Sequence, residues 1–381
     1  MRKELKLVAA AFTINLMLGV IYAFSTFVKP LERDFGWGRG QTTLAFAVAQ
    51  LAMNLIVMPG GVLSDRRGPR LAATISGILA GLGLSASSLT SRLEEFYIAY
   101  GLLFGSGVGL GYITAISTIN KLFKERRGLL SGLVVSGYGL SAALFAPIIA
   151  LLEYHMGWRW AFTLVGITVG LGVVASAQLL GIEDQLGEAK PRLQLTSVRW
   201  REFMLLWLTF AAASSAGFTV AGHLAAMAQE VGLDPITASL TVTCFSLANA
   251  SGRVVVGWIS DKLGRLETLA TIFSCQAANM LLAFTNLHLS PLVVFTASLA
   301  AGFFYGPIYA LYPSTVADYY GSENMGTLYG LLLTACAAGS MLGPYLAGAV
   351  YDITGGYTAS FLILGVLLAL ATATVLWLRR G

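Results

Sequence analysis

Long apolar stretches alternate with short polar ones along the whole chain. About twelve of these stretches reach the ~20 residues that a helix needs to cross a hydrocarbon core of ~30 Å. They lie at 7–30, 41–63, 71–90, 96–121, 128–152, 160–181, 203–231, 237–259, 267–287, 291–317, 327–350 and 358–378. None shows the ~10-residue alternation of apolar and polar positions that is typical of an outer-membrane barrel. The pattern therefore predicts an all-α integral membrane protein that crosses the bilayer about twelve times.

The composition supports this prediction. Hydrophobic residues make up 56% of the chain and charged residues only 11%, and the mean hydropathy is +0.73. A soluble domain carries about 25% charged residues, so most of this surface is expected to face lipid. The basic residues are dispersed in short clusters, which argues against a nucleic-acid partner and is typical of loops between membrane spans.

Motifs for enzyme chemistry or for a cofactor are missing from the sequence. It has no phosphate-binding loop with Gly-Lys-Ser/Thr, no dinucleotide fingerprint between a strand and a helix, and no cluster of residues with metal-ligand spacing. The cysteines Cys244, Cys275 and Cys336 all lie inside apolar runs, which indicates neither a disulfide framework nor a metal site. We expect no enzyme activity and no cofactor.

Basic residues determine the expected orientation. When the N-terminus is placed in the cytoplasm, most of the 24 basic residues fall on the cytoplasmic side. The positive-inside rule therefore predicts that both termini are cytoplasmic. The basic residues on the other side are Lys29, Arg33, Arg39, Arg92 and Arg159. Compact loops and short tails favour a prokaryotic inner (plasma) membrane and a monomer.

The longest polar segment, 182–202, falls near the middle of the chain and predicts a linker between two halves. We expect an N-terminal six-helix bundle at 1–182, a cytoplasmic linker at 183–202 and a C-terminal six-helix bundle at 203–381. The halves repeat a glycine and proline pattern, because positions 128, 132 and 147 in the fifth span match positions 326, 330 and 344 in the eleventh. Two parallel repeats follow from this match.

A short charged motif is also repeated after the second and eighth spans, at positions 196 residues apart. Its first copy consists of Gly61, Asp65, Arg66, Gly68 and Arg70, and its second of Gly257, Asp261, Lys262 and Gly264. The two copies resemble the loop signature of the major facilitator superfamily, and the resemblance covers the whole chain. It implies the major facilitator fold, with two pseudo-symmetric six-helix bundles. It also implies that these residues form a cytoplasmic gate, with the Asp65 carboxylate at a helix N-terminus and the arginines bridging helices.

Two further segments narrow the resemblance. Residues 19–37 (GVIYAFSTFVKPLERDFGW) and 123–132 (FKERRGLLSG) are similar to the oxalate/formate antiporter and monocarboxylate transporter branch of that superfamily. The resemblance implies small carboxylate substrates. Several sub-branches with different substrates share these segments, so they indicate a class of substrate and not one compound.

Arg253 is the basic residue inside a span. It lies eight residues before Asp261, which is about 12 Å along a helix and therefore near the membrane centre. A central arginine costs about 2.5–3.5 kcal/mol on insertion scales, and such residues usually face a pathway or a partner. The acidic residues of this chain lie near span ends, so the missing partner is expected to be a substrate carboxylate, which a guanidinium can hold bidentately. The structural alternative is an arginine satisfied by backbone carbonyls and water.

Two further polar residues inside spans are candidates for the substrate site. Asn249 lies one helical turn away and could orient the guanidinium or touch substrate. Animal monocarboxylate carriers have an aspartate at the equivalent position, so the asparagine leaves the proton route open. His223 in the seventh span has an ordinary pKa near ~6.5 and is the candidate for substrate binding and proton coupling. A buried, merely hydrogen-bonded histidine is the alternative.

Aromatic residues are expected to enclose the apolar part of a small acid. The candidates are tyrosines on spans one, four, five and ten: Tyr22, Tyr112, Tyr138, Tyr305 and Tyr309. Taken alone, a tyrosine in such a position is more often a helix-packing residue. Aligned by its spacing from Tyr305, Cys336 resembles the position where the oxalate carrier presents a lysine. With that second cation missing, the pocket favours a monocarboxylate, because an unpaired second carboxylate would be costly in low dielectric.

These residues predict a secondary transporter of small monocarboxylates such as lactate or pyruvate, working by alternating access with proton symport. Proton symport keeps the charge of the loaded carrier equal to that of the empty one. The first alternative is a carboxylate/carboxylate antiporter of the oxalate:formate type. A non-transporting membrane receptor is a weaker alternative, because the short ends carry no added domain. The expected partners are a small organic monocarboxylate, protons and the lipid bilayer.

Overall fold

A computed structural model describes residues 2–123, 127–180, 198–320 and 325–379, and these form helices joined by short connections. The elements of the first half are α1 (Arg2–Leu18), η1 (Gly19–Ala23), α2 (Ser25–Phe35), α3 (Arg39–Arg67), α4 (Pro69–Ser87), α5 (Leu93–Phe96), η2 (Tyr97–Phe104), α6 (Gly105–Leu122), α7 (Arg127–Met156), α8 (Trp158–Ala177) and η3 (Gln178–Leu180). Those of the second half are α9 (Trp200–Glu230), α10 (Pro235–Leu263), α11 (Arg265–Ala278), η5 (Asn279–Ala283), η6 (Phe284–Leu289), α12 (Pro291–Tyr305), α13 (Ile308–Tyr320), α14 (Met325–Thr354) and α15 (Thr358–Leu378).

Twelve helical segments among the described residues are long and apolar enough to cross a membrane, which confirms the predicted all-α membrane fold. The last span, Thr358–Leu378, has the predicted bounds. The first differs from the predicted 7–30, because the helix breaks at Phe24 between η1 and α2. At the start of this break η1 approaches α7 so closely that a Cβ on Gly19 would lie 2.3 Å from the carbonyl oxygen of Tyr138.

The same local rules start helices at matching places in both halves. Gly68 and Gly264 each form a one-residue junction between two spans, with φ of +89° and +98°, a conformation that other residues rarely adopt. Pro69 begins α4 and Pro235 begins α10, which are not equivalent helices of the repeat, and in both the missing N–H of proline costs nothing. The equivalent glycine junctions support the repeat that the sequence predicts.

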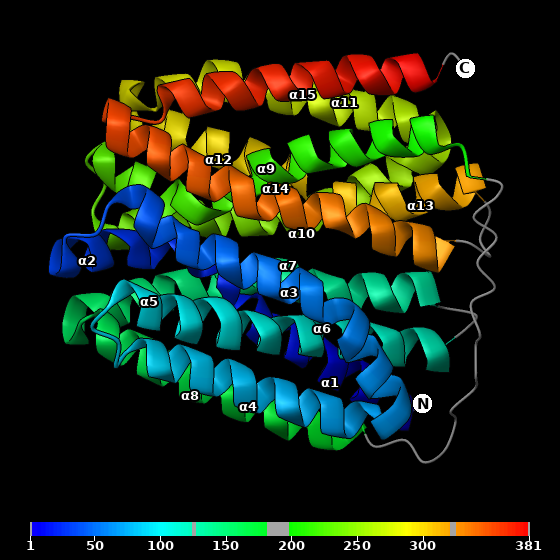
Figure 1. Cartoon of the computed structure of the whole chain (residues 1–381), viewed down its shortest axis with the longest axis horizontal. Coiled ribbons are helices and arrows are strands. Elements are labelled where there is room, and N and C mark those ends of the chain that lie inside the picture. The colour runs from blue at the N-terminus through cyan, green and yellow to red at the C-terminus, as the bar shows by residue number, and fades with distance from the viewer. Residues whose placement is uncertain (1, 124–126, 181–197, 321–324, 380–381) are drawn as a thin grey trace.

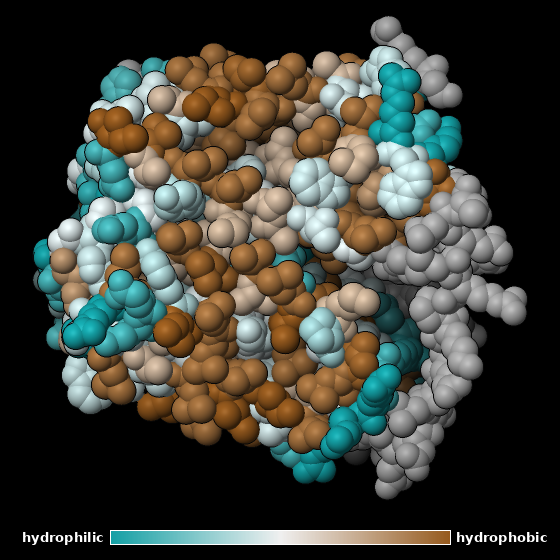
Figure 2. Space-filling view, viewed as in Figure 1, coloured by the Kyte–Doolittle hydropathy of each residue, from teal (hydrophilic) through white to brown (hydrophobic). Residues whose placement is uncertain are grey.

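The two halves lie side by side, with α1–α8 in the lower part of Figure 1 and α9–α15 in the upper part. The start of α1 at Arg2 and the end of α15 at Leu378 lie on the same side of the molecule, and we call this side the terminal end. The side where α2 ends is called the opposite end. Figure 2 shows a broad apolar surface between the two ends, with polar residues gathered toward both of them, as expected for an integral membrane protein.

The predicted linker at 183–202 lies largely outside the described residues, since 181–197 are not described. The helix that follows starts at Trp200, slightly before the expected boundary of 203. The division into bundles at 1–182 and 203–381 therefore stays a prediction.

Contacts between the halves run from the middle of the helices to the opposite end. The Ser246 hydroxyl donates to the carbonyl of Gly139 midway along α10 and α7, and Thr43 donates to the carbonyl of Pro344 (3.2 Å) where α3 meets α14. Closer to the opposite end, a Cβ on Gly348 would lie 2.8 Å from the Cα of Gly40. Backbone therefore packs against backbone across the halves at this end.

Helices of the terminal end are less closely packed. Gly132 of α7, Gly257 of α10 and Gly330 of α14 have open space where a Cβ would lie, with no atom within 4 Å. Among the described residues, the hydrogen bonds and ion pairs at this end join residues of the same half. Within the described residues, the contacts that join the halves are thus concentrated toward the opposite end, and the terminal end is the more open of the two.

Candidate functional site

Arg253 lies on α10, and its side chain is fixed by its own helix. The guanidinium Nε donates to the Asn249 Oδ1 at 3.0 Å, and the guanidinium carbon lies 5.4 Å from the centre of the Tyr309 ring. Asn249 is buried, and its amide Nδ2 has no hydrogen-bond partner among the described residues. No carboxylate in the described part of the chain forms an ion pair with Arg253. The site therefore presents an unneutralised cation and an unused donor.

A line of polar groups continues from Arg253 to other helices of the second half. The hydroxyls of Tyr305 and Tyr309 are 2.7 Å apart, and the Tyr309 hydroxyl lies 3.4 Å from the Sγ of Cys336. Tyr305 ends α12 and Tyr309 lies in the first turn of α13, so the short break between these helices directs both rings to the same place. The structure brings Cys336 to the same cluster, as a neutral thiol donor and acceptor.

Tyrosines of the first half complete the cluster through ring contacts. Tyr138 has its ring centre 5.1 Å from that of Tyr112 and 5.3 Å from that of Tyr22. Phe218 of α9 joins the two halves, because its ring lies 6.2 Å from Tyr22 and 5.7 Å from Tyr305. The predicted residues of both halves therefore form one continuous surface of aromatic rings beside Arg253.

The structure places His223 elsewhere. Its Nδ1 lies 2.9 Å from the hydroxyl of Tyr357, and its Nε2 lies 2.8 Å from the carbonyl oxygen of Pro344. The imidazole is fully buried, with both nitrogens in hydrogen bonds. Of the predicted substrate-binding residues, His223 is the one that the structure groups with the opposite end and not with Arg253.

The motif residues lie at the terminal end. Asp65 pairs with the Lys121 ammonium at the end of α6, whereas the resemblance led us to expect a helix N-terminus as its partner. Arg70 joins α4 to η3 through a 2.7 Å bond to Gln178, which is a bridge between helices of the expected kind. Since α6 packs along α3, Lys121 near the end of α6 lies within reach of the Asp65 carboxylate.

Arg265 directly follows the second copy of the motif and pairs with two carboxylates. It lies between Asp261 (2.6 Å) and Asp318 (3.8 Å), while the Lys262 ammonium lies 3.8 Å from the ring centre of Trp258. The two carboxylates are largely exposed, whereas the Arg265 side chain is only 25% exposed. Gly61 and Gly257 lie in the last turns of α3 and α10, and Arg66 follows Asp65 on an exposed face.

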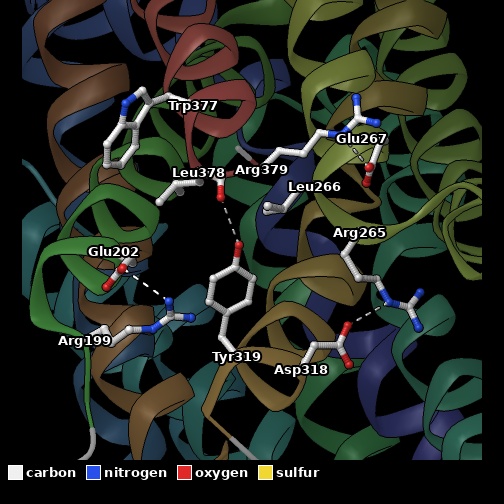
Figure 3. Close-up of a pocket in the computed structure, with 10 residues that line it drawn as sticks. All are labelled: Arg199, Glu202, Arg265, Leu266, Glu267, Asp318, Tyr319, Trp377, Leu378 and Arg379. Atoms are coloured by element: carbon white, nitrogen blue, oxygen red, sulfur yellow. Dashed lines mark hydrogen bonds and ion pairs between the residues drawn. The ribbon is translucent and has the colours of Figure 1, made fainter. Parts of the chain in front are cut away.

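A cavity of about 330 Å³ opens beside this second copy (Figure 3). Each arginine in its wall has a carboxylate partner: Arg199 with Glu202, Arg265 with Asp318 and Arg379 with Glu267. Tyr319 donates to the carbonyl of Leu378 across it (3.5 Å), and Tyr319 lies ten residues beyond Tyr309, about 15 Å along a helix. The cavity is charge-balanced, belongs to one half and lies away from Arg253, so it is not the candidate transport site.

Sequence reasoning missed two features. Phe218 connects the aromatic surface across the halves, and nothing in its local sequence distinguishes it from a packing residue. Arg39 is almost fully buried at the opposite end, with a side chain only 1% exposed. It is one of the few basic residues expected on the side opposite the termini, but nothing in its local sequence indicates that it is buried.

Comparison with known proteins agrees with this architecture. The family model described as Major Facilitator Superfamily matches residues 10–224 and 204–381. The chain is 29% identical to the oxalate:formate antiporter of Oxalobacter formigenes over 386 residues, covering 98% of this chain and 91% of that protein. It is 30% identical to monocarboxylate transporter 11 of Homo sapiens over 390 residues, covering 98% and 82% respectively.

The fold is also similar to a solved structure. A crystal structure of a bacterial homologue of the human lysosomal transporter Spinster, described as inward-facing and unoccupied, superposes with a TM-score of 0.76. The superposition covers 99% of this chain and 97% of that one at 16% sequence identity. At this identity the similarity concerns the arrangement of helices alone.

Proposed function

The chain belongs to the major facilitator superfamily, a family of membrane transporters and not of enzymes, and we propose that it carries small monocarboxylates such as lactate or pyruvate. The two halves would alternate access to the cluster around Arg253. One observation carries the proposal: Arg253 is held in place by Asn249 and Tyr309 but has no carboxylate partner among the described residues. A substrate carboxylate would supply the missing partner of Arg253.

The charge count of the cluster favours one carboxylate. Arg253 supplies one fixed positive charge, and Cys336, across the aromatic surface, supplies a neutral thiol. A second carboxylate on the substrate would lose its hydration without gaining a cation, at a cost of several kcal/mol. The unused Nδ2 donor of Asn249 and the hydroxyls of Tyr305 and Tyr309 suit the oxygens of a short acid, while the rings of Tyr22, Tyr112 and Tyr138 suit its apolar carbons.

Proton symport is the coupling that we propose. A monocarboxylate that enters with a proton leaves the carrier's charge unchanged, whereas an anion alone would be opposed by about 2.3 kcal/mol per 100 mV of inside-negative potential. Exchange of one carboxylate for another is the second candidate, and it is favoured by the lack of a described carboxylate beside Arg253. Exchange needs no group that takes up a proton in the site.

The remaining proposals concern the terminal end. The positive-inside distribution of basic residues supports a cytoplasmic location for this end, and with it both termini. The motif copies around Asp65 and Asp261 would then act as the cytoplasmic gate. In the present conformation they form contacts within one half, which agrees with a gate that is open. A monomer in a prokaryotic inner membrane completes the proposal.

Uptake into proteoliposomes tests the proposal. Radiolabelled lactate would be offered outside, first with an inward proton gradient and then without a gradient but with lactate inside. We expect Arg253→Ala to lower uptake at least about thirtyfold, because it removes a charge-assisted pair to the substrate. The matched control is Arg201→Ala, which removes an exposed arginine whose guanidinium lies 4.8 Å from the centre of the Trp377 ring and makes no ion pair with a described residue.

The outcomes separate the alternatives. Uptake that needs the proton gradient and is lost only in Arg253→Ala supports symport of a monocarboxylate. Uptake that needs internal lactate and ignores the gradient replaces symport by exchange. If Arg253→Ala and Arg201→Ala behave alike, Arg253 does not bind the substrate.

A further inference from the structure

The opposite end of the molecule contains a buried arginine that the transport site does not use. Arg39 is the first residue of α3, and its side chain is only 1% exposed. The guanidinium makes a two-pronged contact with Glu32 of α2, in which Nη2 lies 2.9 Å from Oε2. This first partner belongs to the same half of the chain, and it neutralises the charge without connecting the halves.

Further partners of Arg39 come from the other half. Its Nη1 lies 2.9 Å from the Oε1 of Glu230, the last residue of α9, and it also donates to the hydroxyl of Tyr357. The same Glu230 oxygen lies 3.1 Å from the ammonium of Lys29 on α2. One carboxylate from the second half therefore bridges two cations of the first, and the Tyr351 ring covers the guanidinium at 4.2 Å.

The N-terminus of α3 is capped from the other half as well. The residue before Arg39 is Gly38, which has no side chain to accept a bond from the first N–H groups of the helix. The Asp352 carboxylate at the end of α14 takes that place, accepting from the amides of Arg39 (2.7 Å) and Gly40 (2.8 Å). A free helix N-terminus binds negative charge well, so this carboxylate adds a second connection between the halves.

His223 extends the same network inward. Its Nε2 faces the carbonyl oxygen of Pro344, which can only accept, so Nε2 carries the proton. Its Nδ1 then accepts from the Tyr357 hydroxyl, which in turn accepts from Arg39. A neutral imidazole satisfies both contacts, and the ring connects α9, α14 and the residue before α15 into one unit that faces Arg39.

We propose that Lys29, Arg39, Glu230, Asp352 and Tyr357 form a gate, the Arg39 gate, that holds the opposite end closed while the terminal end is open. Separation of the halves at this end would strip Arg39 of Glu230 and Tyr357 and uncap α3 at the same time. His223 is a supporting residue of this gate, not a proton carrier in the transport site. The inference goes beyond the proposed function, since it holds for whichever acid is carried.

Hydrogen–deuterium exchange of the full chain in lipid nanodiscs, without substrate, tests the gate. The variant is Glu230→Gln, which keeps the shape of the side chain but removes the charge shared by Arg39 and Lys29. We expect amides in peptides 36–46 and 344–357 to exchange roughly tenfold faster, since the variant weakens the charge-assisted contacts that hold the halves together at this end. Peptides 130–138 and 328–335 should exchange more slowly, because the terminal end closes when the opposite end opens.

A matched control lies on the same helix. Glu202→Gln makes the same chemical change in the first turn of α9, where Glu202 pairs with Arg199 of its own half (3.4 Å), and it should change neither set of peptides. Asp352→Asn weakens a different contact of the gate, the cap of α3. It should change the exchange rates of both sets of peptides in the same directions as Glu230→Gln. The proposal is overturned if Glu230→Gln and Asp352→Asn leave exchange unchanged, or if they speed the first set without slowing the second, which is what local damage would do.

Discussion

The two ends of this transporter hold their helices together by different means. At the opposite end the cation is Arg39, with a side chain 1% exposed and with partners from both halves. At the terminal end each described ion pair joins residues of one half and has at least one side chain more than half exposed, as in the pair of Asp65 and Lys121 (52% and 51%). The buried cation is thus the one whose ion pairs join the two halves, whereas the more exposed ion pairs lie within one half.

The comparison shows which end sets the conformation. Exposed ion pairs contribute about 0–1 kcal/mol, because water competes for both partners. A buried pair is costly to break by removing one partner, because the other charge is left without solvent or counter-ion. In the conformation described here the contacts that resist separation of the halves are therefore concentrated at the opposite end, while the terminal end is free to close.

The largest effect is expected from removing the buried cation. Arg39→Ala leaves Glu32 and Glu230 close together without their shared guanidinium, and we expect it to lower the free energy of unfolding by about 3 kcal/mol, because both carboxylates retain some contact with water. Arg265→Ala removes the central arginine of the terminal-end motif and should cost at most about 1 kcal/mol. Thermal unfolding in detergent, followed by intrinsic tryptophan fluorescence, compares the two.

Equal shifts of Tm in these two variants would contradict the comparison, since they would show that burial at Arg39 does not matter. A large decrease in Tm in Arg265→Ala alone would mean that the stabilising contacts lie at the terminal end, which also contradicts the comparison. Arg39→Lys serves as an internal control: it keeps the charge but cannot make the two-pronged contact with Glu32, so it should fall between the parent and Arg39→Ala.

A smaller effect is expected from glycines at the two ends of α14. A Cβ on Gly348 would lie 2.7 Å from the Thr43 hydroxyl and 2.8 Å from the backbone of Gly40, whereas Gly330 has open space. Gly348→Ala should therefore push the halves apart at the opposite end and cost about 1–3 kcal/mol of the closed arrangement there. Gly330→Ala should change little, within about 0.5 kcal/mol.

Exchange of peptides 36–46 measures this pair of variants, and it should rise in Gly348→Ala alone. If Gly330→Ala raised it equally, the close backbone packing of α3 and α14 would not be what holds this end together. If neither variant changed it, the Arg39 gate would be sufficient without the glycine contact.

Sequence patterns predicted the features that depend on periodicity and composition. Twelve spans follow from apolar length, and the Gly68 and Gly264 junctions follow from the repeated motif, because each is decided by residues close together in the chain. The cluster of Tyr22, Tyr138 and Tyr305 was also predicted, although its residues come from different spans, because the family resemblance supplied that information.

The opposite end was not predicted, for a physical reason. Arg39 has the appearance of a surface charge in sequence, and it is buried only because Glu230 and Tyr357, more than 190 residues away, come from the other half. His223 was assigned by its chemistry alone, and its partners Pro344 and Tyr357 are also more than 120 residues away, although they belong to the same half. Contacts between residues so far apart in the chain have no local signal, so a titratable residue inside a span could not be assigned to the site or to the gate.

The smallest effect is expected where a carboxylate caps a helix of its own half. Asp234 accepts from the amides of Ile236 (3.0 Å) and Thr237 (3.1 Å) at the start of α10, which is the same chemistry that Asp352 offers to α3 from across the halves. Hydrogen bonds from Thr237 lower the pKa of Asp234 below its ordinary value. The carboxylate therefore stabilises the fold above the ordinary Asp pKa of about 3.9, and this contribution is lost as the pH falls through the lowered value.

Asp234→Ala should accordingly lower Tm slightly, by the same amount from pH 8 to pH 5, with the difference from the parent shrinking only below about pH 4. It should leave exchange of peptides 36–46 and 328–335 unchanged, because its cap joins nothing across the halves. Asp352→Asn should change both: exchange should become faster in peptides 36–46 and slower in peptides 328–335. If the two aspartate variants gave the same exchange pattern, capping from the other half would have no special role, and closure of the opposite end would depend on Arg39 and Glu230 alone.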